Sequence, residues 1–411
     1  MSATTISSGP ASPQGVGAGT VSLQARLRDR LIRVLALGLG PTIERPLQLD
    51  HVQRVLVLQL QRLGDSLVFT PALRAIRRRF PDARIDLLTN RVGEGLYAKC
   101  PHFERVFVDS SSKGAHWSNR HILHLLREIR AERYDIVVAD VNQRSLWYGF
   151  VAMLSGAPQR IGFDEDGRGF LFTARVPVPP DSDFITCNMA LAGQLGADPS
   201  DRALECYFDA ADEGRVDALL GAMQTGGPLI AMHPGSNWQS KTWLPENWAA
   251  LADALVARHG ARVVLVGGPR EREAVQEILA LTRRAVTSLA GHTSLAELGA
   301  LLSRCDLVVT TDSGPRHLAA CTDRPTVTIM SSQDLPERWS FGWEREIVLR
   351  TDPPCSPCYQ SYCSHRRCMT EISIEMALNA CEAALAAVPS RRPRVTSAVE
   401  VRSTGSASTR A

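Results

Sequence analysis

The sequence lacks several features that would place it in a specialised class of protein. Its ten cysteines in 411 residues are too few for a disulfide scaffold, and its formal net charge of +3 gives no basis for binding nucleic acid through bulk electrostatics. No uninterrupted apolar run reaches the ~20 residues that a membrane-spanning helix needs. The first residues lack the basic stretch and apolar core of an export signal. We therefore expect a cytoplasmic protein without a nucleic-acid partner.

The composition suits two packed domains of ordinary size. Hydrophobic residues make up 44% of the 411. Apolar runs of strand length alternate with helical stretches, which predicts mostly parallel sheets with helices on both faces. In the first half, strands are expected at 55–60, 85–89, 106–109 and 136–140, and helices at 67–80, 119–130 and 146–155. The pattern predicts two Rossmann-like, doubly wound α/β domains, at 51–215 and 222–388.

The segments outside these domains are polar or amphipathic. Residues 1–20 are rich in Gly, Ser and Pro, and residues 389–411 have almost no large apolar side chains, so both are expected to be disordered. Residues 21–50 are expected to form an amphipathic helix and a linker, with leucines at helical spacing among arginines. That helix either lies on an anionic membrane surface or packs onto the first domain. Another amphipathic stretch, 371–388, predicts a terminal helix that can cross back to the first domain.

The most informative segment reads TTDSGPRHLAA and begins at Thr310. A short buried strand is expected at 307–310 and a helix at 314–320, with Asp312 or Ser313 as the residue that caps it. Gly314 lets the backbone approach a ligand closely. Free N–H groups and the positive end of the helix dipole would then face an anion beyond the strand.

A second loop of this kind follows the apolar run at 229–232 and reads HPGSNWQSK. Ser236 and Asn237 offer hydroxyl, amide and backbone donors, and Lys241 adds a mobile positive charge. Alone, the loop could equally be an ordinary polar connection with a solvated lysine. Two such loops in one sheet favour a site for the phosphates of a nucleotide-linked donor.

Through these motifs and others along the chain, the sequence resembles the ADP-heptose:lipopolysaccharide heptosyltransferases, family-9 glycosyltransferases with the GT-B fold. The resemblance covers residues 54–385 and is carried by several motifs in the right order. They are QLQRLGDSLVFTPAL within 55–89, HPGSNWQSKTWLPENWAALA from His233, VVLVGGPRERE at 263–273, the segment 294–320, and RPTVTIM at 324–330. The resemblance implies two domains facing across a cleft, an acceptor domain at 51–215 and a donor domain at 222–388.

The resemblance also implies a catalytic base in the first domain. The motif LGD follows the first strand, and the helix after it is expected to begin near Ser66, with Gly64 permitting a tight turn. Asp65 matches the aspartate that the family uses to take the proton of the acceptor hydroxyl. From the residues alone, the favoured role of Asp65 is the N-cap of that helix.

Departure of the nucleotide places negative charge on the donor phosphate, and the residues expected to stabilise it are Lys241, Ser236, Asn237 and the helix end at 313–317. Three further assignments leave alternatives open. Arg316 would contact phosphate or solvent, and His317 either lies near the donor phosphates, as the resemblance implies, or is a core or capping histidine. Asp312 would bind a sugar hydroxyl, cap the helix, or do both.

Recognition of the nucleoside is less clear from the sequence. Gly267 and Gly268 allow close approach of a base or ribose, and a carboxylate at Glu271 or Glu273 would bind ribose hydroxyls. The loop at 293–295 is where adenine would lie in this fold, but adenine itself is implied only by the resemblance. The Asp164-x-Asp166 pair lies in a first-domain loop, so no catalytic metal is expected.

A cluster of cysteines stands outside this scheme. Four thiols lie close together in the sequence, with His365 between the last two, at Cys355, Cys358, Cys363 and Cys368. They would either hold a structural Zn or Fe ion or be free thiols that oxidise on isolation.

The sequence thus indicates an inverting glycosyltransferase that moves a heptose from ADP-heptose to a hydroxyl of the lipopolysaccharide core or a related envelope glycan. Its partners would be the donor, a lipid-linked glycan and the inner face of the cytoplasmic membrane, where it would bind peripherally. The alternatives are a GT-B transferase with another nucleotide sugar or a protein acceptor, a non-catalytic nucleotide-sugar-binding protein, and a nucleotide-sugar epimerase.

Overall fold

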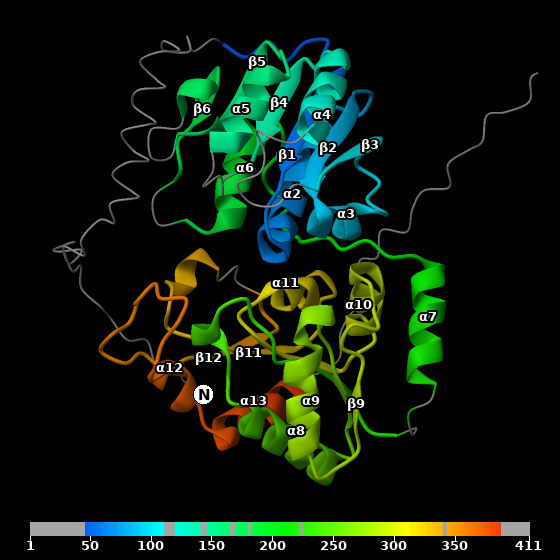
Figure 1. Cartoon of the computed structure of the whole chain (residues 1–411), viewed down its shortest axis with the longest axis vertical. Coiled ribbons are helices and arrows are strands. Elements are labelled where there is room, and N and C mark those ends of the chain that lie inside the picture. Colours follow the sequence, from blue (N-terminus) through cyan, green and yellow to red (C-terminus); the bar gives the residue numbers. More distant parts are fainter. Residues whose placement is uncertain are drawn as a thin grey trace, which may run out of the picture.

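The computed structural model describes residues 46–110, 120–140, 146–164, 169–179, 182–221, 223, 226–339 and 343–387. Two parallel sheets of six strands each form the frame, one above the other in Figure 1. The expected disordered ends (1–20 and 389–411) and the amphipathic helix at 21–39 lie outside the described residues.

The first sheet has the order β3-β2-β1-β4-β5-β6, and all its strands pair in parallel. Its strands are β1 (Arg54–Gln59), β2 (Arg84–Asn90), β3 (Arg105–Asp109), β4 (Ile136–Ala139), β5 (Gln159–Phe163) and β6 (Ala174–Val176). The helices around it are α2 (Leu63–Arg79), α3 (Arg91–Tyr97), α4 (Arg120–Ala131), α5 (Leu146–Leu154) and α6 (Phe184–Gln194), with a short turn of 3₁₀-helix, η1 (Gly169–Leu171). The strands predicted from the sequence are all present, to within a residue or two at each end.

The second sheet has the order β12-β11-β10-β7-β8-β9. Its strands are β7 (Leu229–His233), β8 (Arg262–Leu265), β9 (Val286–Ser288), β10 (Leu307–Thr311), β11 (Thr326–Ile329) and β12 (Glu346–Leu349). Its helices are α8 (Pro245–His259), α9 (Arg272–Leu281), α10 (Leu295–Leu302), α11 (Gly314–Cys321), α12 (Arg367–Thr370) and α13 (Ile374–Ala386), with 3₁₀ turns η2 (Gln239–Lys241), η3 (Pro269–Glu271) and η4 (Pro336–Arg338).

Both sheets have the same doubly wound topology, because each starts in its middle and is extended first to one side and then to the other. In such sheets ligands bind beyond the carboxyl ends of the strands where the winding reverses. That point lies between β1 and β4 in the first half and between β7 and β10 in the second. The predicted fold class, two Rossmann-like domains, is confirmed.

The two halves meet through two pairs of helices. Helix α2 packs against α11, and α3 packs against α10 (Figure 1). One apolar cluster of buried residues is continuous from the first half into the second and includes Leu204, Cys206 and Phe208 of the connecting segment. Helix α7 (Ala210–Leu220) follows this segment and packs against α10.

Helix α13 is the predicted terminal helix, and it packs against α8 and strands β10, β11 and β12. Its contacts are thus made in the second half, because its apolar side chains, among them Ala377 and Cys381, belong to the core of that half. In the described part of the chain, no helix is both long enough and apolar enough to cross a membrane.

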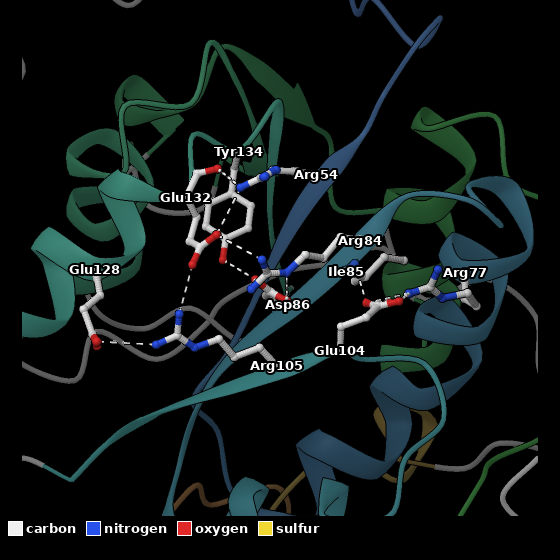
Figure 2. A network of polar contacts seen from close by, with 10 residues as sticks. All are labelled: Arg54, Arg77, Arg84, Ile85, Asp86, Glu104, Arg105, Glu128, Glu132 and Tyr134. Atoms are coloured by element: carbon white, nitrogen blue, oxygen red, sulfur yellow. Dashed lines mark hydrogen bonds and ion pairs between the residues drawn. The ribbon is translucent and has the colours of Figure 1, made fainter. Parts of the chain in front are cut away.

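The amino ends of the first three strands carry a network of charged residues (Figure 2). Glu132 pairs with three arginines, one from each strand: Arg54, Arg84 and Arg105. Tyr134 donates a hydrogen bond of 2.6 Å to the buried Asp86, and burial together with this carboxylate raises the pKa of Tyr134. The network lies at the edge opposite the carboxyl ends, so it holds the sheet in register and leaves the other edge for ligands.

Candidate active site

The carboxyl ends of β7 and β10 bring the two predicted phosphate loops together. The strands are neighbours, with Thr310 paired opposite His233. Beyond them, Thr311 Oγ1 donates a hydrogen bond of 2.5 Å to the carbonyl oxygen of Gly235. The loop after β7 and the start of α11 therefore form a single site. Their contact with phosphate stays a prediction.

His233 lies at the centre of this site, although no role was predicted for it from the sequence. Its side chain is buried. Its Nδ1 lies 3.2 Å from Ser313 Oγ and 3.4 Å from Thr310 Oγ1, while its Nε2 lies 3.1 Å from Glu271 Oε1. The imidazole thus links the helix end at Ser313 to the carboxylate at Glu271. The only signal in the sequence was its place as the last residue of a strand before Pro-Gly.

Glu271, rather than Glu273, is the carboxylate that belongs to the site. Its Oε2 accepts a hydrogen bond of 2.6 Å from the backbone N–H of Gly268, whereas Glu273 is exposed on α9. A Cβ atom at Gly235 would lie 1.6 Å from Glu271 Oε1, so only glycine leaves room for this carboxylate. Burial acts to raise the pKa of Glu271, but His233 and the Gly268 N–H outweigh it and the pKa is lowered. The carboxylate is thus ionised and held in place beside the loop at 235–237.

Lys241 is not solvated, because it forms an ion pair with Asp312. Its Nζ lies 2.6 Å from Asp312 Oδ2, and only 15% of the lysine side chain is exposed. The residue is presented by the turn η2 and lies over the ring of Trp238, 5.4 Å from its centroid. Burial opposes ionisation of Asp312, but the charges of Lys241 and Arg316 outweigh it and hold its pKa well below the ordinary value.

Arg316 contacts neither solvent nor the open side of the phosphate loops, and the expectation for it is wrong. Its side chain is 0% exposed. Nη1 lies 3.1 Å from Asp312 Oδ1, and Nε and Nη2 donate to the two carboxylate oxygens of Glu346 at 2.6 and 2.9 Å. The reason is its position near the start of α11, one turn after Asp312, from which its side chain reaches both Asp312 and Glu346 of β12.

Helix α11 begins at Gly314, with Ser313 as its N-cap in extended conformation. Neither Ser313 nor Asp312 caps the helix with its side chain, because Ser313 Oγ lies by His233 and both Asp312 oxygens are engaged by Lys241 and Arg316. The capping role proposed for Asp312 is therefore excluded.

His317 lies at the interface between the two halves. A Cβ atom at Gly64 would approach His317 Cδ2 to 2.8 Å, so glycine is what allows α2 and α11 to meet here. The ring also lies 5.4 Å from the centroid of Trp339 and 5.8 Å from that of Trp343. Burial, followed by the charge of Arg316, lowers the pKa of His317 to about 3. The ring is therefore neutral near pH 7, where it can take part in hydrogen bonds but carries no charge.

Asp65 lies in the first turn of α2, one residue after Gly64. The helix begins at Leu63, earlier than predicted, and its N-cap is Arg62, which makes no side-chain capping bond. Asp65 is therefore not the N-cap. Gly64 lies within the helix and serves the approach of His317, rather than a tight turn. Since Leu63 also lies against Gly314, the first turns of α2 and α11 face each other, and Asp65 belongs to that turn of α2.

A second carboxyl group, Asp140, accompanies Asp65. It is buried at the end of β4, where its Oδ2 accepts a hydrogen bond of 2.9 Å from Gln59 Nε2. Gln59 Oε1 in turn accepts a bond of 2.8 Å from Ser66, the residue after Asp65. Burial and the charge of Asp65 raise the pKa of Asp140 well above its ordinary value. The protonated form of Asp140 is therefore favoured beside Asp65.

The decisive comparison is with models of protein families. The family described as "Glycosyltransferase family 9 (heptosyltransferase)" matches residues 122–369, which include both donor loops and the helices between them. The chain belongs to glycosyltransferase family 9. It is therefore an enzyme that transfers glycosyl groups.

Relatives of this family-9 chain include two lipopolysaccharide heptosyltransferases. Lipopolysaccharide heptosyltransferase 3 of Escherichia coli is 27% identical over 281 residues, which cover 66% of this chain and 81% of the relative. Lipopolysaccharide heptosyltransferase 2 of Salmonella typhimurium is 29% identical over 294 residues, covering 67% of this chain and 82% of the relative.

Solved structures show the same GT-B fold. A family-9 glycosyltransferase of Veillonella parvula has a TM-score of 0.70 at 24% identity, covering 83% of this chain and 99% of that one. ADP-heptose lps heptosyltransferase II of E. coli has a TM-score of 0.66 at 22% identity, covering 81% and 98%.

The cysteine cluster of this family-9 enzyme shows no metal site. All four thiols are free, with Cys355 exposed and the other three half-buried. Within the described residues, no three His, Cys, Asp or Glu side chains are placed so as to hold a metal ion. The structural Zn or Fe ion is thus unsupported. By contrast, four cysteines of the two halves are buried, at Cys187, Cys206, Cys305 and Cys321.

Of the remaining predicted residues, some lie at or near the two predicted phosphate loops, and the Asp164–Asp166 pair belongs to the first half. Ser236 Oγ accepts a hydrogen bond of 3.3 Å from the N–H of Trp238, and Asn237 is exposed beside it. Gly267 lies against Glu271, whose side chain would meet a Cβ there at 3.0 Å. Asp164 accepts a bond of 2.9 Å from the Gly169 N–H and thus closes its own loop, and Asp166 lies outside the described residues.

Proposed function

We propose that this enzyme moves a heptose from ADP-heptose to a hydroxyl of the lipopolysaccharide core or a related envelope glycan, with inversion at the anomeric carbon and Asp65 as the base. The observation that carries the proposal is the contact between the first turns of α2 and α11. It places Asp65, which follows Gly64 in the first turn of α2, on the part of the first half that meets the start of α11 in the second.

The names of the relatives support the proposed donor and acceptor. The curated matches are named lipopolysaccharide heptosyltransferases. The E. coli heptosyltransferase WaaC, solved with ADP-2-deoxy-2-fluoro heptose, shares the fold with a TM-score of 0.61 at 20% identity, covering 80% of this chain and 99% of that one. An ADP-linked heptose is therefore the donor that we assign to this chain.

The donor end of the mechanism rests on preformed dipoles and one mobile cation. As the glycosidic bond to the β-phosphate breaks, negative charge grows on the phosphate oxygens. Lys241, the donors of Ser236 and Asn237, and the backbone at Gly314 lie where they can stabilise that charge. Glu271, held by His233, would accept hydrogen bonds from the ribose hydroxyls. These groups supply the stabilisation without requiring a metal ion.

The acceptor end uses a single carboxylate. Asp65 would take the proton from the acceptor hydroxyl as its oxygen attacks the anomeric carbon from the side opposite the departing phosphate. The new glycosidic bond forms as the bond to phosphate breaks, and ADP leaves. Asp312 would orient a hydroxyl of the heptose. His317, neutral at the interface, would provide a hydrogen bond near the phosphates rather than a charge.

The place of action follows from the acceptor that we propose. A lipid-linked glycan under construction lies at the inner face of the cytoplasmic membrane, so the enzyme would work there as a peripheral protein. A flotation assay with vesicles containing lipopolysaccharide precursors tests this part separately from catalysis. An enzyme that never floats with such vesicles would contradict the peripheral assignment.

Two experiments test the proposal. Calorimetric titration with ADP, UDP, GDP and ADP-heptose should show selective binding of ADP and its heptose. Preference for UDP or GDP would overturn the donor assignment while keeping the transferase. The variant Asp65→Asn should lower kcat by roughly 10²–10⁴-fold, the usual contribution of a general base, with ADP affinity near that of the wild type. A parallel loss of ADP affinity would show that Asp65 is structural.

A further inference from the structure

The donor site contains four charged side chains in one chain of ion pairs, from Lys241 through Asp312 and Arg316 to Glu346. The successive contacts are 2.6 Å, 3.1 Å and 2.6 Å. Glu346 is further fixed by Thr328, whose hydroxyl donates to its Oε1 at 2.5 Å. Two cations and two carboxylates alternate, so the chain carries no net charge. Only its first member, Lys241, lies at the open end.

Each carboxylate oxygen of Asp312 has a different cation. Oδ2 accepts from Lys241 and Oδ1 from Arg316. Arg316 gives its Nε and Nη2 to Glu346, which leaves Nη1 for Asp312 and fixes the direction from which it binds. The guanidinium of Arg316 also lies over the ring of Trp343, 5.4 Å from its centroid, and this contact further restricts the orientation of the guanidinium.

We infer that Arg316, oriented by Glu346, is a positioning residue that lets Lys241 leave Asp312 for the donor diphosphate. A buried carboxylate that loses its only cation is strongly disfavoured. With Arg316 in place, Asp312 keeps one charged partner when Lys241 moves to phosphate. Without it, every diphosphate that binds would leave Asp312 buried and unpaired. The inference rests on the proposed function, because it requires a diphosphate ligand for Lys241.

The rival explanation is that the Arg316–Glu346 pair only stabilises the second half. Removing both charges together distinguishes the two. The variant Arg316→Met/Glu346→Gln removes both charges, so no buried carboxylate at position 346 is left without its arginine. The glutamine can still accept the hydrogen bond of Thr328. ADP is the probe, titrated by calorimetry, and unfolding is followed by thermal melting.

The double variant should bind ADP about ten-fold more weakly, the order of magnitude of one charge-assisted hydrogen bond. The same change made in a Lys241→Met background should alter ADP affinity by less than about two-fold, because the coupled residue is already absent. Equal losses in both backgrounds, or unchanged affinity with only a lower melting temperature, would overturn the inference.

A matched control exists in the first half, where Arg74 Nη1 lies 2.9 Å from Glu205 Oε1 in a comparably buried pair. Arg74→Met/Glu205→Gln should lower the melting temperature without changing ADP affinity.

If the double variant at α11 fails to fold, the single variant Glu346→Gln tests the inference instead. It removes the carboxylate that orients Arg316, so ADP binding should weaken when Lys241 is present and change by less than about two-fold in the Lys241→Met background. A purely structural role would give equal changes in both backgrounds. Wild-type protein that does not bind ADP would remove the proposed function itself, an outcome seen before any variant is made.

Discussion

Replacing Gly64 by alanine should slow catalysis by holding the two halves apart. The added Cβ would lie 2.8 Å from His317 Cδ2 and 3.2 Å from its Nε2. Carbon atoms prefer separations of about 3.5–4.0 Å, so helix α2 or the His317 ring has to move by roughly 1 Å. The ring has little room, because Trp339 and Trp343 lie against it.

The magnitude follows from the distance between this contact and the chemistry. Asp65 is the next residue along α2, so a shift of α2 displaces it by a similar amount. A misplacement of about 1 Å costs on the order of 10²-fold in rate. Alanine in place of glycine within a helix gains about 1 kcal/mol of helix propensity, which offsets a strain of about 1–3 kcal/mol at the contact. Turnover should therefore fall far more than stability does.

The assay compares kcat at saturating donor with the affinity for ADP. ADP binds to the second half in our proposal, so Gly64→Ala should lower kcat about 100-fold while its dissociation constant for ADP stays within about two-fold. Gly214→Ala on α7 is the control, since a Cβ there meets nothing within 4 Å. Wild-type kcat in Gly64→Ala would refute the reasoning, because catalysis would then not need α2 and α11 in contact.

Three other outcomes are expected. The pKa of His317 is lowered from its ordinary 6.5 to about 3, so the unfolded chain takes up its proton first, and the free energy of unfolding should fall as pH drops through that interval, with a slope of up to about 1.4 kcal/mol per pH unit. In His317→Gln this part of the slope should vanish, and an unchanged slope in denaturant titrations would contradict the assignment. Lys241→Ala should weaken ADP binding and lower turnover together, and calorimetry that finds unaltered ADP affinity would remove Lys241 from the phosphate site. Activity should survive EDTA, and elemental analysis of protein purified without oxidation should find less than one equivalent of zinc or iron, whereas one full equivalent would restore the metal at the cysteine cluster.

The fold was largely predictable because its signals are local. The strand expected at 85–89 is β2, Arg84–Asn90, and the strand expected at 307–310 is β10, Leu307–Thr311. Buried strands of a parallel sheet are continuous apolar runs, which a sequence displays directly. The start of α2 was placed too late, because Gly64 was interpreted as a turn residue. Gly64 instead leaves room for His317, and no local sequence pattern predicts a contact between residues so far apart in the chain.

The site was predictable where it follows a strand and not where it depends on pairing between distant segments. Both loops predicted to bind phosphate follow a central strand, and their strand–turn–helix pattern is visible in the sequence. The partner of Arg316 is Glu346, which comes from another strand, β12, so a solvent-exposed arginine seemed equally reasonable from the sequence. His233 and Asp140 were missed for the same reason: each acquires its surroundings only when neighbouring strands set their ends together. The choice between Glu271 and Glu273 needed the position of Gly235.

The ion pair between Lys241 and Asp312 has a consequence for what the donor site admits. If Lys241 is the phosphate ligand, an incoming anion competes with a carboxylate that is tethered beside the lysine, and a tethered competitor acts at an effective concentration on the order of millimolar or more. A lone phosphate ion in the cell, with one group to offer, gains too little to displace it. A diphosphate that is also held by the loop at 235–237 and through its ribose by Glu271 has several points of attachment. The carboxylate of Asp312 thereby excludes simple anions from Lys241, and only a ligand with the whole nucleotide displaces it.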